Sequence, residues 1–141
     1  MKYLTCSLTC PTIPLGFAVL FFGCATTNPN ITRLQTDTRF QEAARQLVTD
    51  YLEAQKQGDS GIRFGGGGRF YNLAEYQIVN FGWEWNSPAV FLRIKAGNQG
   101  GGNPIWRDYA IRLSHDPKLE AAGDRYLGLR VGSAGETRVK F

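Results

Sequence analysis

The spacing of apolar residues changes once along this chain, from the period of a helix to that of a strand, and this change restricts the fold class. Over residues 38–56 the apolar side chains recur at spacings of three and four, which places them on one stripe of a helix. From Tyr71 onward they alternate with polar residues, as along a half-buried strand. A helix followed by a run of antiparallel strands is an α+β arrangement.

The predicted helix is long and has recognisable ends. Its apolar stripe consists of Phe40, Ala43, Ala44, Leu47, Val48, Tyr51 and Leu52. Thr38 with Gln41 three residues later fits a capping box, and Gly58 is a favourable residue just after a helix. We expect one long N-terminal helix, packed through this stripe on a curved antiparallel sheet of about four strands.

A glycine-rich segment, residues 58–69, separates the two periodic regions and includes four consecutive glycines at 65–68. A phosphate-binding loop would continue with Gly-Lys-Ser/Thr, and a dinucleotide-binding loop would place GxGxxG between a strand and a helix. Neither pattern occurs here. We interpret the segment as a flexible connector.

Four strands are predicted, at 71–85, 89–96, 105–114 and 126–131, and residues 117–124 are expected to form a turn or short insertion. The first strand should place Gln77, Val79, Phe81, Trp83 and Trp85 on one face. In the second, Val90, Leu92 and Ile94 should lie opposite Phe91, Arg93 and Lys95. In the third, Ile105, Tyr109, Ile111 and Leu113 should lie opposite Trp106, Asp108, Ala110 and Arg112. Residues 132–141 are expected to add at most a frayed edge strand.

The three cysteines, Cys6, Cys10 and Cys24, all lie in the first part of the chain, and residues 25–141 contain one histidine and no cysteine. A disulfide scaffold would distribute cysteines through the domain, and a zinc site would combine them with histidines. We therefore expect no metal and no cofactor. The formal net charge is +4, but the basic residues are scattered, and this pattern does not predict a nucleic-acid-binding surface.

The first 23 residues have the parts of a signal peptide. Lys2 is followed by an apolar run at 13–22, which is about half as long as a membrane-spanning helix needs. The sequence Leu20-Phe-Phe-Gly-Cys24 resembles the lipobox of bacterial lipoproteins, in which a small residue precedes a cysteine that becomes acylated. Gly23 and Cys24 match, whereas Leu20 stands one position before the usual leucine. Cleavage by the ordinary signal peptidase and a membrane-associated hydrophobic segment stay open as alternatives.

The lipobox resemblance implies an order of segments and an address. Residues 1–23 are a lipoprotein signal peptide, residues 24–35 a flexible tether, and residues 36–141 a single α+β domain. Two or three acyl chains on Cys24 would hold the protein in a membrane stably. The expected location is the bacterial cell envelope, with the domain on the extracytoplasmic side.

The order of elements resembles the NTF2-like and cystatin-like folds, in which a long helix lies against a curved antiparallel sheet. The likeness is carried by the helical segment 47–54 running into Gln57-Gly-Asp59, and by the strands 91–95 and 105–113 flanking a Gly/Asn/Pro loop. NTF2-like domains usually have two further helices before the main sheet, and here only residues 62–76 offer a segment for one. This departure favours a shallower, cystatin-like layer over a deep cone.

An isomerase-like enzyme of the NTF2-like superfamily would need an acidic group and a tyrosine inside the cone. Asp108 and Tyr109 are the nearest candidates, but neighbours on a strand point to opposite faces. Tyr71 or Tyr126 are alternative partners, and a surface ion pair of Asp108 with Arg93 or Arg112 is the competing interpretation. The consecutive residues Ser114, His115 and Asp116 cannot form a catalytic relay and are interpreted as a turn.

A set of four aromatic side chains is the only candidate site for a ligand. Phe81, Trp83, Trp85 and Trp106 would line a pocket on the sheet, or would form core beneath the helix. The hypothesis favoured by the sequence is a non-enzymatic, lipid-anchored binding or assembly module whose partner is an apolar small molecule or an envelope protein. The alternative is an NTF2-like ligand-binding or isomerase-like enzyme. A cystatin-like inhibitor ranks last because the Gln-x-Val-x-Gly hairpin is missing.

Overall fold

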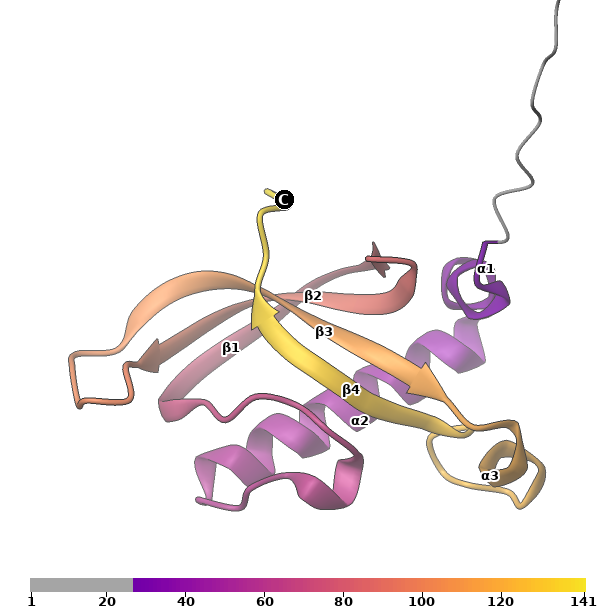
Figure 1. Ribbon diagram of the computed structural model, residues 1–141, viewed down its shortest axis with the longest axis horizontal. Helices are drawn as coiled ribbons and strands as arrows, with labels where there is room; N and C mark the ends of the chain where they lie inside the picture. Colours follow the sequence, from indigo (N-terminus) through magenta and orange to yellow (C-terminus); the bar gives the residue numbers. More distant parts are fainter. Residues whose placement is uncertain (1–26) are drawn as a thin grey trace, which may run out of the picture.

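A four-stranded antiparallel sheet lies on helix α2 in two layers, in a computed structural model that describes residues 27–141 (Figure 1). Its helices are α1 (Pro29–Thr36), α2 (Thr38–Lys56), the 3₁₀ helix η1 (Ile62–Phe64) and α3 (Pro117–Ala121). Its strands are β1 (Tyr71–Glu84), β2 (Ser87–Gly97), β3 (Ile105–His115) and β4 (Leu129–Glu136), paired in the order β1-β2-β3-β4. The predicted α+β class is confirmed, while Cys24 and the predicted signal peptide lie outside the described residues.

The sheet face that packs on α2, called here the covered face, holds the main core. From β2 it contributes Val90, Leu92 and Ile94, which are fully buried against the apolar stripe of α2. From β3 and β4 it contributes Ile111, Leu113, Leu129 and Val131. The predicted alternation of β2 and β3 is confirmed by the register, in which Leu92 is opposite Tyr109 and Arg93 is opposite Asp108.

Helix α2 begins and ends where the sequence predicted, but its N-terminal cap is a different residue. The carboxylate of Asp37 accepts hydrogen bonds from the backbone N–H groups of Arg39 and Phe40, at 3.0 and 3.3 Å. The predicted capping box of Thr38 and Gln41 is therefore wrong, because Asp37 is the N-cap and the Gln41 N–H donates to the Asp37 carbonyl. At the other end Gly58 has a φ of +81°, the left-handed conformation expected just after a helix.

Residues 29–36 form a helix, so two predictions about this region are wrong. The expected tether over residues 24–35 is helical from Pro29 onward, and α2 is preceded by α1 rather than being the N-terminal helix. Asn28 caps α1, and Pro29 occupies the first turn, where a missing N–H has no consequence. Ile31 and Leu34 are buried, and the helix packs against α2, β1 and β2. Two apolar residues are too short a stripe to stand out in the sequence.

An ionic cluster fixes α1 to the far end of the chain. Arg33 donates two hydrogen bonds to the carboxylate of Glu120 in α3, at 2.8 and 2.5 Å. The same carboxylate lies 2.7 Å from Nε2 of His115 at the end of β3. The hydrogen bonds from Arg33 and the contact with His115 lower the pKa of Glu120 to about 2. The cluster therefore holds three elements together while Glu120 is ionised.

The glycine-rich segment is packed against the edge of β4, so its interpretation as a flexible connector is wrong. Gly65 forms a parallel bridge with Val131, and the N–H of Gly66 donates to the carbonyl of Val131. A Cβ on Gly66 would lie 2.6 Å from the carbonyl oxygen of Gly132, and one on Gly67 would meet Tyr51. Side chains are excluded here because the segment lies directly on the strand, where it covers an otherwise open sheet edge.

A β-bulge in β1 reverses the faces that the sequence predicted for this strand. Ile78 pairs with Leu92 and Asn80 with Phe91, so Val79 is an extra residue in the ladder. Gln77 consequently lies on the open side of the sheet, whereas Phe81 lies on the covered face. The prediction of one continuous face from residue 77 to residue 85 is wrong for this reason. Strand β4 also begins and ends later than the predicted 126–131.

Candidate binding surface

The sheet face that does not contact α2, called here the outer face, carries polar side chains in rows across β1, β2 and β3. Three ion pairs cross it: Lys95 with Glu75 at 2.9 Å, Arg93 with Asp108 at 3.3 Å, and Arg112 with Glu84 at 2.6 Å. The first two pairs join neighbouring strands, whereas the third reaches across β2 from β3 to β1. The expected surface pairing of Asp108 is confirmed, and its partner is Arg93.

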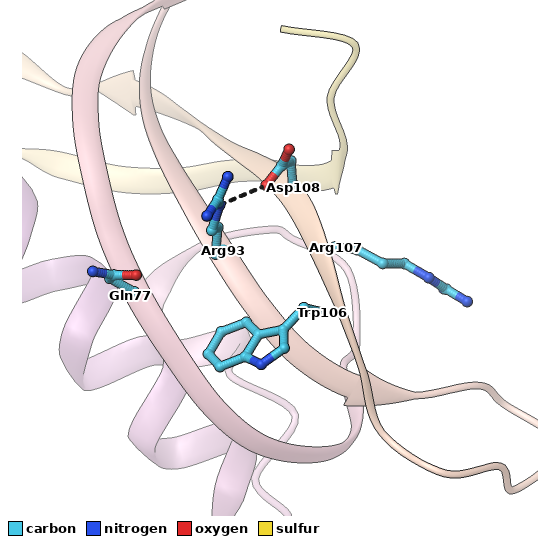
Figure 2. A pocket seen from close by; sticks show the side chains of 5 residues that line it. All are labelled: Gln77, Arg93, Trp106, Arg107 and Asp108. Carbon is cyan, nitrogen blue, oxygen red and sulfur yellow. Dashed lines mark hydrogen bonds and ion pairs between the residues drawn. The ribbon is translucent and has the colours of Figure 1, made fainter. Parts of the chain in front are cut away.

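A hollow of about 430 Å³ lies on this face beside Trp106. It is lined by Gln77, Arg93, Trp106, Arg107 and Asp108. The Trp106 ring extends from β3 across β2 towards β1, and Arg93 and Asp108 face one another above it (Figure 2). Arg107 points away from the ring (Figure 2), towards Asn98 and Glu136, to which it donates hydrogen bonds. Trp106 is 48% exposed, so its ring is available to a partner.

The chemistry of this hollow suits recognition. The indole ring offers an apolar surface, while Gln77, Arg93 and Asp108 offer donors and acceptors around it. Lys95 Nζ lies 6.0 Å from the centre of the Trp106 ring, at the limit of a cation–π contact. Arg93 and Asp108 are partly exposed and bonded to each other, so neither has the desolvated surroundings of a catalytic acid or base.

The four aromatic residues of the predicted pocket do not come together. Phe81 packs at the margin of the covered core, where the Arg45 guanidinium lies 5.2 Å from its ring centre. Trp83 is at the end of β1 and Trp85 is in the turn between β1 and β2, whereas Trp106 is at the opposite end of the sheet. The alternative of core beneath the helix is also wrong for the tryptophans, which are 48–84% exposed. The bulge at Val79 and the early turn explain the errors for the β1 residues, and the pairing of Trp106 with Lys95 places Trp106 at the far end of the sheet.

The C-terminal segment after β4 divides the outer face. The Phe141 ring lies 5.7 Å from the ring of Phe91 and covers the small apolar cluster of Phe91, Ala89 and Ala110. Thr137 donates a hydrogen bond to Glu84 at 2.7 Å, which fastens the start of this segment to β1. Sequence reasoning missed this role, because a single aromatic residue in a polar stretch gives no periodic signal.

A second hollow, of about 560 Å³, lies between α2 and the connection from α3 to β4. Its charged residues bond to one another: Arg125 and the Tyr126 hydroxyl both donate to Asp50 at 2.8 Å, and Arg130 bonds Asp124 at 2.9 Å. Burial and the bond to Asp50 raise the pKa of Tyr126 above its usual value. Tyr126 is thus paired with Asp50 and not with Asp108. We regard this network as the attachment of the connection to α2.

The catalytic arrangements considered from the sequence are not found within residues 27–141. In that range the only buried ionisable side chains are those of Tyr51 and Tyr126, so the covered face holds no buried carboxylate. Burial raises the pKa of Tyr51 to about 12, and its hydroxyl donates to the Gly68 carbonyl. Ser114, His115 and Asp116 do not form a catalytic relay, because His115 contacts Glu120 and Asp116 caps α3.

Across the part of the chain that the structure describes, His, Cys, Asp and Glu side chains form no group of three suited to a metal ion, and no helix is long and apolar enough to cross a membrane. Comparison of the chain with known protein families, with curated proteins and with solved structures finds no match.

Proposed function

We propose that this protein is a non-enzymatic binding or assembly module of the bacterial cell envelope, anchored by lipid on Cys24 and facing the extracytoplasmic side. The observation that carries the binding role is the outer-face hollow at Trp106. A half-exposed tryptophan bordered by an arginine is the composition typical of the energetic centre of a protein interface.

An envelope protein fits this surface better than an apolar small molecule. Small apolar ligands are held in concave, mostly apolar pockets that bury most of their surface. The Trp106 hollow is instead bordered by the ion pair of Arg93 and Asp108 and by the amide of Gln77. Such a mixture of an aromatic centre and a polar border resembles the anatomy of protein–protein interfaces.

Within the α+β class, we propose a cystatin-like rather than an NTF2-like fold. The single layer of α2 on the sheet supports this proposal. One main helix crosses one face of the sheet, and the space between them is filled by aliphatic and aromatic side chains. The isomerase-like alternative needs a carboxylate inside this space. Among the described residues no carboxylate is buried there, which favours the binding module.

The anchoring part of the proposal has a direct test. Intact mass spectrometry of the chain purified from membranes should give a mature protein that begins at Cys24 and carries acyl chains. The Cys24→Ser variant should lack them and leave the membrane fraction. A mature wild-type chain that starts elsewhere and carries no lipid would contradict the anchor.

The binding part is tested with a photo-cross-linking amino acid placed at position 77, at the border of the hollow, in the full chain in living cells, so that Trp106 is kept. We expect a defined adduct with one envelope protein, which is abolished by Asp108→Arg because this change reverses a charge at the border of the hollow. Position 42, on the exposed side of α2, is the matched control. The proposal fails if position 77 gives no adduct beyond those seen at position 42.

A further inference from the structure

We propose that the turn between β1 and β2, with Trp83 and Trp85, docks on the bilayer surface in which the lipid of Cys24 is inserted. This inference rests on the lipid anchor proposed above and adds the orientation of the domain on the membrane. The surface consists of Trp83, Trp85, Asn86, Arg138 and Val139, and is called here the turn surface. It is distinct from the Trp106 hollow.

The turn surface lies close to the segment that leads to the proposed lipid anchor on Cys24. Asn28 donates two hydrogen bonds to Asn86, from its backbone N–H to the side-chain oxygen at 3.4 Å and from its amide to the backbone carbonyl at 3.3 Å. Helix α1 accordingly lies beside the β1–β2 turn (Figure 1). Cys24 is four residues before Asn28, so its Cα is tied to within about 14 Å of the Asn28 Cα whatever path the chain takes.

Two tryptophans project at this end of the molecule. Trp83 is 56% exposed and lies near Ile31 of α1, and Trp85 is 84% exposed, with its ring 4.9 Å from the Arg112 guanidinium on the outer face. The indoles therefore flank the turn on both sides. Tryptophan is the residue that favours the interface between headgroups and acyl chains, because one part of its ring system is apolar and its N–H is polar.

The backbone conformation of the turn is unfavourable for a bulky residue such as Trp85. Trp85 and Asn86 have φ values of +51° and +57°, as both central residues of a type I′ hairpin turn require. Asn and Gly suit these positions, whereas a bulky residue with positive φ is strained by about 1 kcal/mol. The cation–π contact with Arg112 leaves the Trp85 side chain 84% exposed, so most of its surface is available for an external contact.

Charge on the turn surface complements a bacterial membrane. Arg138 and Val139 line a hollow of about 600 Å³ together with Trp83 and Trp85, and Val139 is 46% exposed. The same hollow contains Glu84 and Glu136, which are already paired with Arg112 and Arg107. Arg138 is exposed and forms no ion pair with another residue in 27–141, so its charge is available to an anionic lipid headgroup.

Docking through the turn surface directs the Trp106 hollow away from the membrane. Trp83 pairs with Pro88 and Trp106 with Lys95, seven residues apart along β2, which is about 23 Å at about 3.3 Å per residue. The connection between β2 and β3 accordingly lies at the opposite end of the sheet from α1 (Figure 1). The hollow would then face the envelope space in which a partner is met.

The test uses the three tryptophans as reporters, since the chain contains no others. The lipidated full chain is reconstituted into vesicles of phosphatidylethanolamine and phosphatidylglycerol, with and without brominated acyl chains, which quench nearby indoles. The Trp106→Phe variant keeps only the two turn residues, and the Trp83→Phe/Trp85→Phe variant keeps only Trp106. We expect brominated lipid to reduce emission about twofold in the first variant and to leave the second almost unchanged.

The outcomes separate this inference from the anchor on which it rests. Acylated Cys24 together with equal quenching in both variants, or with none in either, overturns the docking and leaves the anchor standing. An unacylated Cys24, seen by intact mass, overturns both. Circular dichroism of the two variants should match the wild type, because the replaced side chains are exposed. Arg138→Glu should reduce the quenching of the turn tryptophans at low salt, and the difference from wild type should shrink in high salt, because salt screens the attraction to anionic lipid.

Discussion

The two faces of the sheet differ in the interactions that stabilise them. The covered face is closed by α2 and buries aliphatic side chains such as Leu92 and Ile111 completely. The outer face has one small apolar cluster around Phe91, which is closed by Phe141, and is otherwise crossed by ion pairs of which two are substantially exposed. Exposed ion pairs contribute little to stability. Folding free energy therefore comes mainly from the covered face.

Neighbouring residues on β2 give the sharpest test of this division. Leu92 points to the covered face and Phe91 to the outer face. Leu92→Ala should lower the free energy of unfolding by about 3 kcal/mol, because it leaves a cavity between α2 and the sheet. Phe91→Ala removes a larger side chain but should lower it by only about 1–2 kcal/mol, since water can fill the opened site and no cavity remains. Urea denaturation of both variants measures the difference.

Equal losses for the two variants would show that the two faces contribute equally to stability. The covering of Phe91 by the C-terminal segment would then stabilise the fold as strongly as α2 does. Phe141→Ala separates the two cases, because it uncovers Phe91 without changing the sheet. A loss below that of Phe91→Ala agrees with a segment that is only a local cover.

The faces of β2 and β3 could be predicted from the sequence because their alternation is uninterrupted. Those of β1 could not. The bulge at Val79 shifts every later residue by one position, and nothing in the run from Gln77 to Trp85 marks it. The predicted binding residues were separated for the same reason: the pattern of Phe81, Trp83 and Trp85 is regular in the sequence but crosses a bulge and enters a turn.

Helix α1 and the glycine segment were missed for different physical reasons. The Asn28-Pro29 pair is an N-cap followed by a favourable first residue, and this signal could have revealed α1. The glycines could not have been interpreted locally, because the strand that excludes their side chains lies some 65 residues later in the chain. Likewise, the ionic cluster of Arg33 joins residues that only the tertiary fold brings together.

The glycine segment extends the comparison from the faces of the sheet to its edge. Gly66 does not have a positive φ, so the effect of Gly66→Ala comes from contact alone. Its new Cβ would lie 2.6 Å from the backbone oxygen of Gly132, and relief requires the segment to move off β4. We expect a loss of about 1–3 kcal/mol in thermal or urea unfolding. Gly100→Ala is the control, since its Cβ would contact nothing and should leave stability unchanged.

The smallest expected changes in the free energy of unfolding come from removing one ion pair on each side of the sheet. Glu120, on the α1 side, accepts two bonds from Arg33 and is about a quarter exposed, whereas Asp108 on the outer face has one bond at 3.3 Å to a half-exposed Arg93. Glu120→Gln should lower the free energy of unfolding at neutral pH by roughly 1 kcal/mol, and Asp108→Asn by less than about half of that. Both are measured by urea titration of matched samples.

The pH dependence identifies the origin of this difference. The bonds from Arg33, together with the contact with His115, lower the pKa of Glu120 from 4.5 to about 2, so the unfolded chain binds a proton at this site more readily than the folded one. The contribution is therefore complete above about pH 4.5 and is lost as the pH falls towards 2. The gap between wild type and Glu120→Gln should accordingly be constant above that range and should close below it. A gap that persists at pH 2 would mean that Glu120 stabilises the junction of α1, α3 and β3 by packing rather than by its charge.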